Sequence, residues 1–235
     1  MPQATSVTDK PLIRLSIGVP SYGEWKAGFG HALANALVYM REHCTFRGAD
    51  VELMGVLNCN GTLLPEVRHQ VVTRAIEAGA THLMALDSDM VFPPDAIARL
   101  LSHGKQVVGA NYVRRKFPCY PTAYCHEKET KIYTTPESTG LEQVGHMGLG
   151  CMLFDLSVFD LIEPPWFQFT QVKGGWRTQG EDVHLFKKLH EAGVQIWCDH
   201  DLSQEVQHIG EMPFTHEMAL AQRDLEAEGN LHGLE

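Results

Sequence analysis

The first half of the sequence alternates between short apolar runs and segments in which apolar residues recur every three or four positions. The short runs are typical of buried strands, and the spaced segments are typical of helices with one apolar face. Strands and helices that alternate in this way form a mostly parallel sheet with right-handed crossovers, flanked by helices. The predicted strands are 12–19, 51–57, 81–86 and 106–110, and the predicted helices are 29–40, 66–78 and 96–101.

After Asn111 the apolar pattern becomes irregular. Prolines interrupt short extended pieces at 120–124 and 131–134, which predicts a hairpin or an excursion across the sheet. The chain of 235 residues contains no repeat and no long linker, so we expect an α/β fold in a single domain. Later regular elements are predicted as strands at 151–156 and 194–198, helices at 157–162 and 181–192, and a surface helix at 215–228.

The net charge and the cysteine content indicate which partners and which redox environment the protein has. The formal net charge of -10 argues against broad electrostatic binding to nucleic acid or to an anionic membrane, and leaves the Arg-Arg-Lys run at 114–116 as a local basic patch. Six cysteines occur without a C-x-x-C pair, which favours reduced thiols in a cytoplasmic protein over a disulfide framework or a zinc site. The sequence contains no apolar stretch of about 20 residues and no signal peptide, so we expect neither membrane insertion nor export.

Two acids, Asp87 and Asp89, follow the predicted strand at 81–86 and are separated only by Ser88. Acids at this spacing can converge on one ion only where a strand has ended and the chain turns. Carboxylates without cysteine or histidine beside them suit a hard ion such as Mg²⁺ or Mn²⁺, which keeps positions open for phosphate oxygens. The motif therefore indicates a metal site for a nucleotide diphosphate, although a capped helix start or a solvated turn would have the same sequence.

Two further features indicate chemistry in the second half of the chain. Glu181 and Asp182 fall in the first turn of a predicted amphipathic helix, shortly after a Gly-Gly-Trp segment at 174–176. A glycine-rich loop beside an aromatic residue can close over a sugar, and a carboxylate at a helix start can serve as a general base. The alternative is that these acids only complement the helix dipole. His208 ends a short predicted strand, where a lone histidine is usually structural.

In this order the motifs resemble the GT-A-fold glycosyltransferases, in particular the small bacterial and phage enzymes related to glycosyltransferase family 2. The resemblance extends from Ile17 to Gly210. Each motif alone is weak, and the ordered set is more specific. The residues that carry it are Val-Pro-Ser at 19–21, Arg68, Leu-Asp-Ser-Asp-Met-Val-Phe-Pro-Pro-Asp at 86–95, Val-Gly-Ala at 108–110, Gly-Leu-Gly-Cys-Met-Leu at 148–153, Gly-Glu-Asp-Val at 180–183, and His208.

The resemblance implies that the ends of the first and third predicted strands bind a nucleotide sugar and a divalent cation, Mn²⁺ or Mg²⁺. Asp89 would bind the metal, His208 would be an additional ligand, and Asp87 would face the ribose or a metal-bound water. The residues that contact the nucleotide would be Ser21, Tyr22, Glu24, Arg68, Asp87 and Ser88.

By the same resemblance, Asp182 would be the catalytic base, and Glu181 would orient the acceptor or cap the glycine-rich loop. A sugar would pass from a nucleotide diphosphate sugar, most commonly a UDP-sugar, to a hydroxyl, with inversion at the anomeric carbon favoured and retention as the alternative outcome. The protein would act in the cytoplasm of a bacterium or a phage-infected host. The chain would divide into a flexible N terminus at 1–10, a nucleotide-sugar-binding half at 11–111, an acceptor and catalytic half at 112–212, and a C-terminal surface helix and tail at 213–235.

The acceptor and two other classes of function stay open. A glycan, a small molecule or a hydroxymethylated DNA base could supply the hydroxyl, and for DNA the run 114–116 with Tyr112, Phe117 and Tyr120 would offer phosphate contacts and stacking. A nucleotidyltransferase can share the fold, but the segment 20–26 does not match the basic, glycine-rich loop that such enzymes usually have after the first strand. A binding module without turnover is the third class. The sequence does not indicate the oligomeric state.

Overall fold

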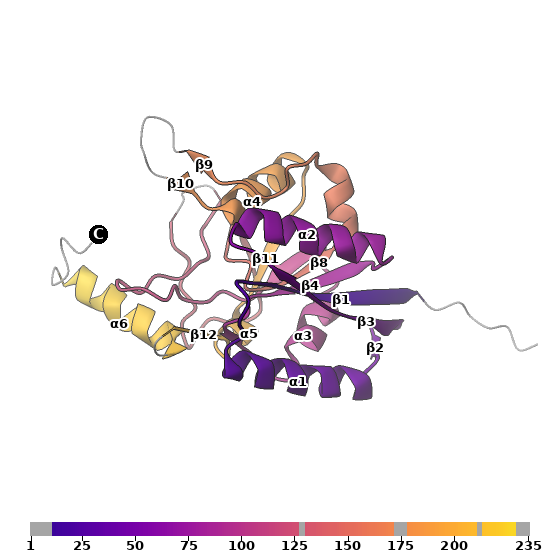
Figure 1. Cartoon of the computed structure of the whole chain (residues 1–235). Helices are drawn as coiled ribbons and strands as arrows, with labels where there is room; N and C mark the ends of the chain where they lie inside the picture. The colour runs from indigo at the N-terminus through magenta and orange to yellow at the C-terminus, as the bar shows by residue number, and fades with distance from the viewer. Residues whose placement is uncertain (1–10, 127–129, 172–177, 211–212, 229–235) are drawn as a thin grey trace, which may run out of the picture.

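The computed structural model describes residues 11–126, 130–171, 178–210 and 213–228, and a large central sheet runs through it (Figure 1). Eight strands pair in this sheet, and both predicted halves of the chain contribute to it. In spatial order they are β2 Thr45–Phe46, β3 Ala49–Asn60, β1 Leu12–Ser21, β4 His82–Leu86, β8 Cys151–Asp155, β6 Val107–Gly109, β11 Ile196–Asp199 and β7 Leu141–Val144.

Helices cover both faces of the sheet (Figure 1). Helices α1 Ala27–Glu42 and α3 Ala96–His103 pack on one face, and α2 Leu64–Glu77 and α4 Glu181–Glu191 pack on the other. The predicted end of α2 at Gly79 is confirmed, because this glycine has a left-handed φ of 79° and its amide donates to the carbonyl of Ile76. The expected α/β architecture with flanking helices is therefore present.

The direction of the strands is more mixed than the sequence predicts. Strands β3, β1 and β4 are parallel to one another, and β6 is parallel to β11. Strand β8 lies between β4 and β6 and runs antiparallel to both. The described residues between β6 and β8, at 110–126 and 130–150, form no crossover helix, so the geometry that enforces parallel pairing does not apply to β8.

Several short elements surround the D-x-D motif and the second half of the chain. Strand β12 pairs with β5, and this pairing sets His208 opposite Met90, next to Asp89. The helix predicted at 157–162 is a 3₁₀ helix, η1. The short elements are β5 Met90–Val91, η1 Leu156–Leu161, β9 Thr170–Gln171, β10 Thr178–Gln179, α5 His200–Ser203, β12 Gln207–Ile209, β13 Pro213–Phe214 and α6 His216–Ala227.

Among the described residues of the range 112–150, β7 is the only strand, and the rest is irregular. The predicted hairpin is reduced to isolated bridges, in which Tyr124 pairs with Lys131 and with His146. Prolines remove the backbone donors that a continuous ladder needs. Helix α6 fastens this segment, because Gln222 accepts from the amide of Cys119 and the hydroxyl of Tyr120 donates to Glu226 at 2.7 Å. Of the helices that the structure describes, none is long and apolar enough to cross a bilayer.

Candidate functional site

Three elements from distant parts of the sequence meet at the carboxyl end of β4. Asp87 follows this strand, and its amide donates to the carbonyl of Gly150 at 3.0 Å, just before β8. Arg68 reaches the same place from α2, and Glu181 reaches it from the first turn of α4. The structure thus brings together residues that the sequence assigns separately to donor binding and to catalysis.

The guanidinium of Arg68 joins two carboxylates. Its Nη2 lies 2.9 and 3.2 Å from the two carboxylate oxygens of Asp87, and its Nε lies 3.0 Å from Oε1 of Glu181. Only 6% of Arg68 and 7% of Glu181 are exposed. Burial alone would lower the pKa of Arg68, but Asp87 and Glu181 outweigh burial and raise the pKa, so the guanidinium stays charged. We call these three residues the Arg68 junction.

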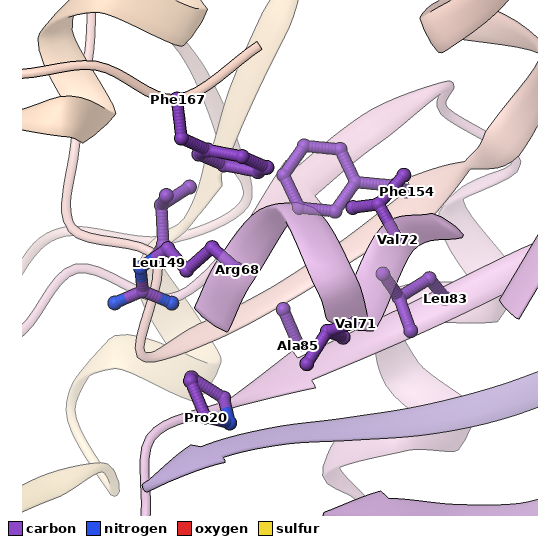
Figure 2. A pocket seen from close by; sticks show the side chains of 9 residues that line it. All are labelled: Pro20, Arg68, Val71, Val72, Leu83, Ala85, Leu149, Phe154 and Phe167. Atoms are coloured by element: carbon purple, nitrogen blue, oxygen red, sulfur yellow. The ribbon is translucent and has the colours of Figure 1, made fainter. Parts of the chain in front are cut away.

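The aliphatic part of Arg68 lies over a small apolar cavity between α2 and the sheet. Figure 2 shows the guanidinium at the end of this cavity, pointing away from Val72 and Phe154. The cavity volume is about 10 Å³, which is about the space of one water and too small for a substrate. It is therefore part of the packing that holds Arg68 and not a ligand site. Its walls are Pro20, Arg68, Val71, Val72, Leu83, Ala85, Leu149, Phe154 and Phe167.

The glycines before β8 allow Tyr112 and Asp87 to pack against the backbone. The buried hydroxyl of Tyr112 accepts a hydrogen bond from the amide of Gly150 at 3.0 Å. A Cβ atom on Gly148 would lie 2.2 Å from this hydroxyl, and one on Gly150 would lie 3.0 Å from Oδ2 of Asp87. Sequence reasoning missed this role, because glycines before a strand do not match a phosphate-binding loop.

Asp89 faces two side chains from the second half of the chain. Its Oδ2 lies 2.8 Å from Nη1 of Arg115, and its Oδ1 lies 3.4 Å from Nε2 of His208. The Nδ1 of His208 lies 2.9 Å from the carbonyl oxygen of Val113. A carbonyl oxygen can only accept, so Nδ1 carries a proton, and this hydrogen bond orients the ring so that Nε2 faces Asp89.

The arrangement of Asp89 and His208 fits a bound cation. Oδ1 of Asp89 is buried and makes no hydrogen bond within the part of the chain that the structure describes. Burial alone would raise the pKa of Asp89, but His208 and Arg115 outweigh it and keep this pKa below its ordinary value. Histidines that bind metals usually donate their second nitrogen to a carbonyl or carboxylate, as His208 does.

The predicted set of three metal residues is not assembled as one cluster. Across the described ranges, no three His, Cys, Asp or Glu side chains lie close enough together to hold one ion. Asp87 is instead bound on both oxygens by Arg68, which leaves Asp89 and His208 as a pair. A metal on this pair would take its other ligands from phosphate oxygens and water, as Mg²⁺ and Mn²⁺ commonly do.

A cleft of about 310 Å³ opens beside this pair, and we call it the donor cleft. Its volume is at the lower end of the range for small-molecule sites. Ser21 shapes the rim, because its hydroxyl accepts from the amide of Gly23 at 2.9 Å and donates to the carbonyl of Glu24 at 3.3 Å. The lining residues are Pro20, Ser21, Tyr22, Glu24, Lys26, Gly61, Leu64, Asp87, Ser88, Asp89, Arg115 and His208.

Most of the predicted donor residues line this cleft, and a few residues were missed. Arg68 supports the cleft through Asp87 and does not line it. Lys26, Gly61 and Leu64 carry no motif that would have identified them. The amide of Lys26 donates to the carbonyl of Ser88 at 3.0 Å, which fixes the loop after β1 against the D-x-D turn.

The two acids at the start of α4 have different surroundings. Glu181 is buried within the Arg68 junction, where its Oε1 accepts from Nε of Arg68. Oδ1 of Asp182 accepts from the amide of Val183 at 2.8 Å. Burial, followed by the nearby charge of Glu181, raises the pKa of Asp182 to about 6. Asp182 is therefore the acid of the two that is not tied to Arg68 and whose pKa is raised toward neutrality.

Most of the aromatic residues considered for stacking on a DNA base are buried. Tyr112 is 5% exposed, and Tyr120 is 8% exposed. The Arg114 guanidinium and the Lys131 ammonium lie over the Tyr120 ring, 5.0 and 3.6 Å from its centre. Of these aromatic residues only Phe117 is exposed, so this part of the prediction is wrong for Tyr112 and Tyr120.

Comparison with solved structures shows the fold. No family model and no curated protein matches the sequence. A197 from STIV is similar over 88% of this chain and 92% of its own, with 17% identity and a TM-score of 0.57. A Drosophila beta-1,4-galactosyltransferase 7 mutant, in complex with manganese, UDP-Gal and xylobiose, matches over 84% of this chain and 71% of its own, with 12% identity and a TM-score of 0.47. The fold is the GT-A fold that the sequence predicts.

The Arg68 junction predicts a large effect of removing its cation. Arg68→Ala should lower the free energy of unfolding by about 3–5 kcal/mol, because the buried carboxylate of Glu181 and the partly buried one of Asp87 lose their counter-charge. Urea denaturation at pH 7 measures this difference. Arg74→Ala, on an exposed position of the same helix, should stay within about 0.5 kcal/mol of the wild type. Equal effects of the two substitutions would contradict the structural role of Arg68.

The raised pKa of Asp182 predicts a pH-dependent stability difference. The folded chain holds the Asp182 proton up to about pH 6, whereas the unfolded chain releases it near pH 4, so wild-type stability falls between these values. Asp182→Asn removes this titration and should gain stability relative to the wild type across that window, reaching at most about 3 kcal/mol above pH 6. Denaturation curves at several pH values test this. A stability difference for Asp182→Asn that does not change with pH would refute the assignment, and Asp160→Asn at an exposed position serves as the control for loss of a surface charge.

Proposed function

We propose that the chain is a metal-dependent glycosyltransferase that moves a sugar from a nucleoside diphosphate sugar to a hydroxyl acceptor. The observation that carries the proposal is the pair formed by Asp89 and His208 at the edge of the donor cleft. This pair presents a buried carboxylate oxygen without a hydrogen bond and, 3.4 Å from it, an imidazole nitrogen whose ring is oriented by the carbonyl of Val113. A carboxylate oxygen and an imidazole nitrogen are ligand atoms that one divalent cation can share.

The donor cleft supplies groups for each part of a nucleotide sugar. Asp89 and His208 would hold Mn²⁺ or Mg²⁺, which would neutralise the charge that develops on the departing nucleoside diphosphate. Lys26 and Arg115 add positive charge along the cleft for the phosphates. The loop at 21–24 and Ser88 would hold the nucleoside, for which uridine is the proposed base by resemblance.

Asp182 would accept the proton of the acceptor hydroxyl as that oxygen attacks the anomeric carbon. Its pKa of about 6 makes it a stronger base than an ordinary aspartate while it remains ionised at neutral pH. Attack from the face opposite the leaving group inverts the anomeric carbon. Arg68 and Glu181 would act by positioning, because the Arg68 junction ties the first turn of α4 to the end of β4.

The surroundings of the site favour a glycan or small-molecule acceptor over a modified DNA base. Two of the three aromatic residues that would stack on a base are buried, and one of the three basic residues lies over Tyr120. A nucleotidyltransferase would release pyrophosphate from a nucleoside triphosphate, and an inert module would bind without turnover. Both alternatives are outcomes of the experiment below. We propose that the enzyme acts in the cytoplasm.

The first test is a screen of nucleotide sugars for hydrolysis, which needs no knowledge of the acceptor. Release of nucleoside diphosphate should require Mn²⁺ or Mg²⁺, stop with a chelator and return when metal is added. Asp89→Asn should remove both the metal dependence and the affinity for nucleoside diphosphate, and His208→Ala should give a partial form of this defect. Asp160→Asn is the control and should behave as the wild type. Metal-independent turnover, or full activity of Asp89→Asn, would refute the metal site.

The second test separates the base from donor binding. Asp182→Asn should lower the rate of transfer by about 10² to 10⁴, which is typical for loss of a general base. Donor affinity, measured by calorimetry with metal present, should stay within a few-fold, because Asp182 does not line the donor cleft. The wild-type kcat/KM should rise with pH to a plateau above an apparent pKa of about 6. A normal rate for Asp182→Asn would place the base elsewhere.

A further inference from the structure

Arg115 lies where it competes with a metal for Asp89. Its Nη1 is 2.8 Å from Oδ2 of Asp89, and it lines the donor cleft together with Asp89 and His208. The other oxygen of Asp89 is the one that faces His208. One small carboxylate is therefore shared between a guanidinium on one oxygen and the proposed metal position on the other.

The side chain of Arg115 is less tightly held than those of Asp89 and His208. The Arg115 side chain is 43% exposed, whereas the side chains of Asp89 and His208 are 15% and 13% exposed. The carbonyl of Asp89 also accepts from the amide of Ile209 at 2.8 Å, which fixes the acid against β12. Arg115 can leave without unpacking its surroundings, and Asp89 cannot.

We propose that Arg115 is an exchangeable counter-ion, which neutralises Asp89 before the donor binds and moves to the diphosphate when a metal takes its place. This inference rests on the proposed function, since it concerns the same metal and diphosphate. A largely buried carboxylate is costly without a nearby cation, so Arg115 stabilises Asp89 in the empty site. A metal brings a second positive charge close to the guanidinium and repels it.

A diphosphate resolves this repulsion, because a guanidinium binds phosphate oxygens through two parallel hydrogen bonds. Metal and nucleoside diphosphate should therefore bind cooperatively, and metal alone should bind weakly. Arg115 would set this coupling: it opposes the metal when no phosphate is present and supports the complex when phosphate is present. Such a coupling is reciprocal, so it can be measured from either ligand.

The experiment measures binding rather than activity. Free Mn²⁺ is followed by electron paramagnetic resonance, with and without UDP, and UDP binding is followed by calorimetry in saturating Mn²⁺. The variants are Arg115→Ala and the matched control Lys116→Ala, which removes the same charge one residue away. Lys116 is exposed and lies outside the set of described residues that line the donor cleft. Melting temperatures confirm that both variants are folded.

Arg115→Ala should bind Mn²⁺ alone several-fold more tightly than the wild type, because the competing cation is gone. The same variant should bind UDP with Mn²⁺ about 10-fold or more weakly, because a charge-assisted hydrogen bond is lost. Lys116→Ala should match the wild type in both measurements. The opposite signs distinguish this role from a general loss of positive charge, which would weaken UDP binding and strengthen Mn²⁺ binding in both variants.

Unchanged or weaker binding of Mn²⁺ alone by Arg115→Ala would overturn the exchange, as would unchanged UDP affinity. In those cases wild-type binding of Mn²⁺ with UDP would still support the proposed function. If the wild type binds no Mn²⁺ even with UDP, the proposed metal site and the exchange are both refuted. If the wild type binds Mn²⁺ equally with and without UDP, the metal site stands and the coupling through Arg115 does not.

Discussion

One buried guanidinium, that of Arg68, fixes the relation between the two parts of the site. It contacts an acid at the end of β4 and an acid in the first turn of α4, and those acids are far apart in sequence. Arg68 contacts both acids, so its positive charge offsets the repulsion between their negative charges. The apolar packing below Arg68 keeps the guanidinium from turning away.

The D-x-D motif therefore presents two acids with different counter-ions. Asp87 has a permanent one, since Arg68 is buried and held on both sides. Asp89 has Arg115, which is more exposed and makes a single ion pair. The spacing of one residue turns the two carboxylates toward different partners, and this division explains why the structure does not gather both acids into one metal cluster. Structural support and ligand binding are thus separated within three residues.

The sequence predicts elements whose signal is local. The strand before Asp87, the glycine that ends α2 and the amphipathic start of α4 were all recognised from spacing alone. The position of β8 between β4 and β6 could not be predicted from the sequence, because strand pairing depends on residues distant in the chain. Strand β5, with two residues, is too short to show a period, whereas the short strand predicted at His208 is present as β12.

The contacts between side chains distant in sequence could not be predicted from the sequence either. A basic run at 114–116 in a proline-rich segment looks like a solvated patch, and only the fold sends Arg115 to Asp89 and Arg114 to Tyr120. An acid in the first turn of a helix looks like a partner for the dipole, and only the fold places Glu181 against Arg68.

The antiparallel insertion of β8 also affects how the chain folds. Strands β4 and β6 have no complete sheet between them until residues 151–155 have been added, so the chain up to residue 111 would leave facing strand edges unpaired. The cleft is lined largely by the first half of the chain, yet the sheet that supports it is completed only by strands of the second half.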